Sequence, residues 1–123
     1  MHWLSVAIGG AIGALCRYGV SFYLLPASAH KFPYATLAVN ALGSFAVGIL
    51  YVVILERAQL AEETRYLLMI GFLGAFTTFS TFSLDALSLW QNGHQMMALV
   101  YVLLTVALCL LAVTGAVWLT RLF

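Results

Sequence analysis

Four long apolar segments, at about residues 3–25, 34–55, 65–91 and 96–120, constrain this chain more than any other feature. Inside them, Arg17 and Asp85 are the only charged residues apart from Arg65, which lies at the edge of the third. About 20 apolar residues are enough for one helix to cross a bilayer. The pattern therefore predicts an all-α integral membrane protein with four transmembrane helices at these positions. We expect them to form a single membrane domain that covers residues 1–123.

The composition excludes several classes of protein. Only 7% of the residues are charged, whereas an ordinary soluble domain carries about 25%. A formal net charge of +1 does not supply the basic surface that nucleic acid requires. The three histidines lie at the N-terminus and in turns, without metal-ligand spacing, and no Ser/His/Asp or Cys/His set can be assembled within the membrane. We therefore expect neither an enzyme nor a nucleic-acid-binding protein.

The loop charges bear on orientation. With four spans, both termini and the loop at residues 56–65 share one side of the membrane, which holds Arg57, Arg65 and Arg121. The other side holds Lys31. This is a weak bias for the positive-inside rule. It leaves open whether the chain adopts one orientation or inserts both ways and pairs antiparallel with a second copy.

The first segment contains a small-residue face and one arginine. Gly9 and Gly13 are four residues apart, as are Gly10 and Ala14, so a neighbouring helix can approach closely. Arg17 follows one turn later. Its side chain either reaches the headgroups or lines an aqueous vestibule and attracts anions.

The second segment places polar side chains on one face. Asn40, Ser44 and Gly48 recur every four residues, and Thr36 lies one turn before them. Polar groups in lipid face protein or a water-filled path. Asn40 therefore either bridges two helices or donates hydrogen bonds to a passing anion.

The third segment is the most unusual. Residues 71–83, GFLGAFTTFSTFS, combine glycines and hydroxyl residues with Phe76, Phe79 and Phe82 at intervals of three. Hydroxyl side chains compete with the hydrogen bonds of the helix backbone, and a broken helix in a membrane is tolerated where its freed groups line a cavity or bind an ion. We expect a break at the centre of this helix. The alternative is an intact helix whose hydroxyls bond to carbonyls one turn earlier.

Together, GGAIGALCRY (9–18), ATLAVNALGSFAVG (35–48) and GFLGAFTTFSTFS (71–83) resemble the Fluc/CrcB fluoride channels. The resemblance implies a fluoride-selective channel in the bacterial inner membrane, through which fluoride leaves the cytoplasm passively so that its toxicity is reduced. It also implies an antiparallel, dual-topology homodimer in which the broken third helices of the two subunits cross at the dimer axis.

The resemblance also assigns roles to individual residues. It implies a structural sodium ion, not a transported one, on the backbone carbonyls of Gly74 and Thr77. The pore residues that it implies are Phe79, Phe82, Asn40, Ser80 and Thr81. An acidic position that is frequently Glu in relatives is Asp85 here.

Two other classes have a similar layout. A small dual-topology multidrug/proton antiporter needs a membrane-embedded carboxylate early in the chain, and the first segment has only Arg17. A structural membrane subunit without transport would explain the four helices and the small-residue faces. It would not explain the hydroxyls and phenylalanines clustered in the third segment.

Overall fold

The computed structural model describes residues 2–26 and 31–123. In this part of the chain every regular element is helical, and four helices are long and apolar enough to cross a membrane. They are His2–Leu24, Tyr34–Glu56, Glu62–Gln91 and Gln95–Leu122. The prediction of an all-helical protein with four membrane-length helices is confirmed.

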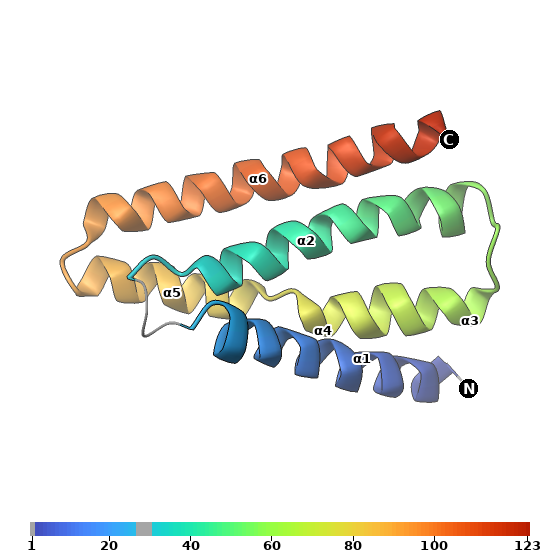
Figure 1. The fold of residues 1–123 in the computed structure, drawn as a ribbon, viewed down its shortest axis with the longest axis horizontal. Helices are drawn as coiled ribbons and strands as arrows, with labels where there is room; N and C mark the ends of the chain where they lie inside the picture. Colours follow the sequence, from blue (N-terminus) through green and yellow to red (C-terminus); the bar gives the residue numbers. More distant parts are fainter. Residues whose placement is uncertain (1, 27–30) are drawn as a thin grey trace.

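The four spans lie side by side, and both termini are at the same end of the molecule (Figure 1). The first span consists of α1 (His2–Gly19) and a π-helical turn, η1 (Val20–Leu24). The second consists of α2 (Tyr34–Leu50) and η3 (Tyr51–Glu56), and the fourth is α6 (Gln95–Leu122). The third is divided into α3 (Glu62–Thr64), η4 (Arg65–Leu73), α4 (Gly74–Phe76) and α5 (Phe79–Gln91).

Two helix pairs hold this arrangement together. Helix α1 packs along η4 and α4, and α2 packs along α6. The buried core is small, with Val39, Val52 and Tyr101 as its largest fully buried side chains. Most of the other large apolar residues are exposed on the single chain, as expected where lipid or another protein chain covers the surface.

Glycines allow α1 to lie directly against the third span. A Cβ atom on Gly9 or Gly13 would overlap backbone atoms of Leu67 or Phe72, and one on Gly71 would lie 2.8 Å from the Val6 carbonyl oxygen. By contrast, a Cβ atom on Gly10 would meet only the Gly71 carbonyl oxygen, at 3.8 Å. The contact face predicted from the glycine spacing is therefore the one that carries Gly9 and Gly13.

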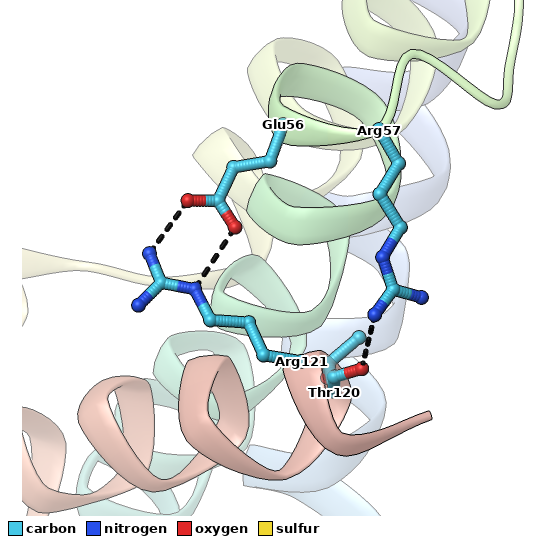
Figure 2. A network of polar contacts seen from close by, with 4 residues as sticks. All are labelled: Glu56, Arg57, Thr120 and Arg121. Atoms are coloured by element: carbon cyan, nitrogen blue, oxygen red, sulfur yellow. Dashed lines mark hydrogen bonds and ion pairs between the residues drawn. The ribbon is translucent and has the colours of Figure 1, made fainter.

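Polar contacts join the second and fourth spans at the end where the C-terminus lies (Figure 2). Arg121 forms a two-point ion pair with Glu56, in which its Nε donates to Oε1 at 3.0 Å. Arg57 donates to the Thr120 carbonyl oxygen at 2.9 Å. The last turn of α6 is thus fixed to the end of η3.

We predict that Gly13→Ala destabilises the protein, because the added methyl group would overlap the Phe72 backbone, which cannot move aside as a side chain does. Overpacking of this kind costs about 1–3 kcal/mol. The measurement is the temperature at which the purified protein in detergent loses its monodisperse size-exclusion peak. Gly10→Ala is the matched control and should stay close to wild type. Equal midpoints for the two variants would contradict the proposed contact face.

Candidate ion-conducting site

The third span is interrupted between α4 and α5. Thr77 (φ −88°, ψ 160°) and Thr78 (φ −153°, ψ 124°) are both extended, and α5 resumes at Phe79. Backbone groups on either side therefore lose the partners that a continuous helix would give them. In a membrane each of these groups needs a replacement partner, because no bulk water is available.

Asn40 on α2 supplies the partners for Thr78. Its Oδ1 accepts a hydrogen bond from the Thr78 N–H at 2.8 Å, and its Nδ2 donates to the Thr78 carbonyl oxygen at 2.9 Å. The Asn40 side chain is buried. One amide thus satisfies both backbone groups of an extended residue, and it joins the second span to the third.

Hydroxyl groups complete the local hydrogen bonding. The Thr78 Oγ1 accepts from the Thr81 N–H at 3.1 Å and so caps the start of α5. The Thr77 and Ser83 hydroxyls each donate to the carbonyl four residues earlier, at 2.9 and 3.0 Å. The bonding that the intact-helix alternative predicted is therefore present, on both sides of the interruption.

The start of α5 presents donors to its surroundings. The first N–H groups of an α-helix have no intrahelical acceptor, and that end of the helix carries a partial positive charge. Here those N–H groups belong to the residues directly after Thr78, which include Phe79 and Ser80. This end of the helix can attract an anion without a formally charged side chain.

Arg17 contacts the other side of the interruption. Its Nε donates to the Ala75 carbonyl oxygen at 3.0 Å, and its side chain is half-buried. Neither expectation for Arg17, the headgroup or the vestibule, included this contact.

A cavity of about 480 Å³ opens beside the interruption and brings together most of the predicted site residues. Among the described residues that line it, none carries a formal charge. Thr105 on α6 also lines this cavity, and its hydroxyl is buried without a hydrogen-bond partner in the described part of the chain. The lining residues that the sequence had singled out are Asn40, Gly74, Thr77, Phe79 and Phe82.

The two phenylalanines occupy different positions. The Phe79 side chain is exposed on the single chain and Phe82 is buried. Their rings are tilted relative to each other, with centroids 5.5 Å apart. Phe76 does not line this cavity and instead stacks on Phe72, at 5.7 Å.

Ser80 and Thr81 are not brought into the same cavity. The Ser80 hydroxyl is exposed, 3.4 Å from the Thr78 hydroxyl. Thr81 lines a second cavity, of about 430 Å³, which also includes Asp85. The Asp85 carboxylate accepts a hydrogen bond from the Tyr101 hydroxyl at 3.2 Å.

Sequence reasoning gave too little weight to three residues. Thr78 caps α5, and a threonine directly before a helix is a usable signal for this role, although the neighbouring hydroxyl residues Thr77, Ser80 and Thr81 obscure it. Thr105 and Cys109 both line the first cavity. With Tyr101 they form a stripe of period four on α6, which the sequence alone does not distinguish from ordinary packing.

Comparison with known proteins identifies the family. The family model "CrcB-like protein, Camphor Resistance (CrcB)" matches residues 4–117. A protein of Saccharophagus degradans named fluoride-specific ion channel FluC is 58% identical over 97% of this chain and 89% of its own length. A protein of the same name from Hahella chejuensis is 49% identical over 98% of this chain and 95% of its own length. The chain therefore belongs to the CrcB family.

Proposed function

We propose that this protein is a fluoride-selective ion channel that lets fluoride leave the cytoplasm passively and so protects against its toxicity. Relatives that match nearly the whole chain are named as fluoride channels. The observation that carries the proposal is the cavity at the interruption of the third span, where a mainly apolar lining holds several polar residues and none with a formal charge.

The chemistry of this cavity suits a small, strongly hydrated anion. Fluoride is a strong hydrogen-bond acceptor, so a narrow path must replace much of its water with donors. The start of α5 provides backbone N–H groups, and the cavity lining includes Thr105, whose hydroxyl has no partner among the described residues. A fixed positive charge would hold the ion too tightly for conduction, which requires binding weak enough for the ion to leave.

The phenylalanine rings add a second kind of contact. An aromatic ring has a positive edge and a negative face. Phe79 and Phe82 lie at the cavity with their rings tilted by 53°. In our proposal their edges touch fluoride, while the hydroxyls of Ser80 and Thr81 continue the path along α5.

The membrane potential supplies the driving force. The protein is a multi-pass membrane protein with a bacterial relative that is named as a fluoride channel. We therefore place it in the bacterial inner membrane. An interior-negative potential favours exit of an anion by about 2.3 kcal/mol per 100 mV. Neither a coupling ion nor a nucleotide is required.

The sodium site implied by the family fits the interruption. In a continuous helix the Thr78 N–H would bond to the Gly74 carbonyl, but here it donates to Asn40. The Thr81 N–H, which would bond to the Thr77 carbonyl, donates instead to the Thr78 hydroxyl. The Gly74 and Thr77 carbonyls are thereby available as oxygen ligands, which hard cations prefer. We propose that they hold a structural sodium ion that is not transported.

An antiparallel, dual-topology homodimer completes this proposal. Two carbonyls from one chain are too few for a sodium ion, whereas a second copy related by a two-fold axis doubles their number. The interruptions of the third spans would cross at that axis. The charge balance between the two sides of the chain, with its weak orientation bias, is compatible with insertion in both directions.

The two alternative functions lack supporting observations. A drug/proton antiporter needs a membrane-embedded carboxylate early in the chain, but the only charged residue of the first span is Arg17. A purely structural subunit would not explain the hydroxyl residues and phenylalanines gathered at the interruption.

Fluoride efflux from liposomes tests the function directly. Vesicles that contain the purified protein and potassium fluoride should release fluoride rapidly when valinomycin allows potassium to follow. Chloride-loaded vesicles should retain most of their anion, because chloride is too large for the path. Fluoride release no faster than from protein-free vesicles, or equal release of chloride, would contradict the proposal.

A sodium-free arm of the same assay separates the ion site from the channel. Protein dialysed for a long time against N-methylglucamine buffer should conduct less, and sodium should restore the rate. Undiminished efflux after sodium removal would refute the sodium site and leave the fluoride channel standing.

Isoleucine substitutions test the ring contacts. Phe79→Ile and Phe82→Ile should form dimers with normal yield but release fluoride more slowly, because an aliphatic group has no positive edge. A lost contact of about 1 kcal/mol corresponds to roughly fivefold in rate. Phe76→Leu is the matched control, since Phe76 stacks on Phe72 outside the cavity. Isoleucine variants that fold and conduct like wild type would show that the rings serve only in packing.

A further inference from the structure

We propose that Arg17 is a positioning residue that caps the carbonyl end of α4 and so fixes the interruption of the third span. The sequence leaves two expectations open for Arg17, a side chain that reaches the headgroups or one that lines an aqueous vestibule. The structure offers a different partner, the Ala75 carbonyl oxygen, at 3.0 Å from the Arg17 Nε. Arg17 is not among the described residues that line either cavity.

The hydrogen-bond accounting explains why a cap is needed here. In a continuous helix the Ala75 carbonyl would accept from the N–H of Phe79. The extended conformation of Thr77 and Thr78 removes that donor. Arg17 replaces it, as the Asn40 Oδ1 replaces the lost acceptor of the Thr78 N–H.

The depth of Arg17 is set by the glycine contact. Gly13 lies against the Phe72 backbone, and α1 runs in the same direction as the third span (Figure 1). One turn further along both helices, Arg17 meets Ala75. The close packing of α1 therefore brings the guanidinium to the end of α4.

Electrostatics favours the same contact. The carbonyl end of a helix carries a partial negative charge, which a cation stabilises. A charged side chain within a membrane needs a polar partner. The contact between Arg17 and Ala75 meets both requirements at once.

The chain contains a second example of this cap in a different solvent environment. Arg57 donates to the Thr120 carbonyl at the end of α6, at 2.9 Å, but this contact is exposed (Figure 2). Water can replace the donor there and cannot do so within the membrane. Arg57 is therefore the matched control for Arg17.

Two substitutions separate the hydrogen bond from the charge. In Arg17→Gln, the amide nitrogen is the same number of bonds from Cα as the arginine Nε, so the donor is kept and the charge is lost. In Arg17→Lys, a methylene group takes the place of Nε, so the charge is kept and the donor is displaced. A vestibule role depends on the charge, whereas the cap depends on the donor at that position.

Amide hydrogen exchange of the full-length protein in lipid nanodiscs tests the cap without any fluoride measurement. In Arg17→Lys the amides of Thr77 and Thr78 should exchange about tenfold faster than in wild type, while Arg17→Gln should stay within about threefold. The same pair of substitutions at Arg57 should leave residues 71–79 unchanged.

Wild-type protection in Arg17→Lys, or equal loss of protection in both Arg17 variants, would overturn the proposal. Fluoride efflux provides the second readout and should fall in Arg17→Lys more than in Arg17→Gln. The opposite order would show that the charge matters and that Arg17 acts as a vestibule residue. The exchange measurement needs no conduction. The cap can therefore be refuted while the proposed channel stands, and the channel can be refuted while the cap stands.

Discussion

The two hydrogen bonds between the Asn40 side chain and the Thr78 backbone are the interaction on which the rest of this structure depends. A helix that is interrupted within a membrane leaves backbone groups that lipid cannot satisfy. An amide side chain is suited to this position because it donates and accepts at once. With Thr78 held in an extended conformation, α5 can begin with its own N-terminus at the cavity.

The other spans take their places around this point. Helix α1 lies close enough for Arg17 to reach Ala75, because Gly9 and Gly13 have no side chains. Helix α6 packs on α2 and brings Thr105 to the lining of the cavity. Side chains from the three other spans thus surround the interruption, and two of them, Arg17 and Asn40, hold its backbone in place.

The sequence predicts the four spans well, because the length of an apolar run reflects bilayer thickness directly. The third span begins at Glu62 rather than near residue 65, since acidic residues are favourable in the first turn of a helix. Periodicity placed Asn40 on a polar face, but its partner depends on the register between α2 and the third span. That register comes from packing contacts and not from any local pattern, which is also why the contact of Arg17 with Ala75 was not foreseen.

The most direct test of this account is the fluoride efflux rate of Asn40→Leu, measured per amount of reconstituted protein. Leucine has nearly the same shape as asparagine but forms neither hydrogen bond, so the Thr78 N–H would be left without a partner, and the Thr78 carbonyl would keep only its bond within α5. An unpaired group costs about 1–3 kcal/mol when buried, and we predict that efflux falls by about tenfold or more. Ser44→Ala, one turn away and lining the same cavity, should retain most of the rate. If Asn40→Leu conducts like wild type, the amide does not maintain the path and the account is wrong.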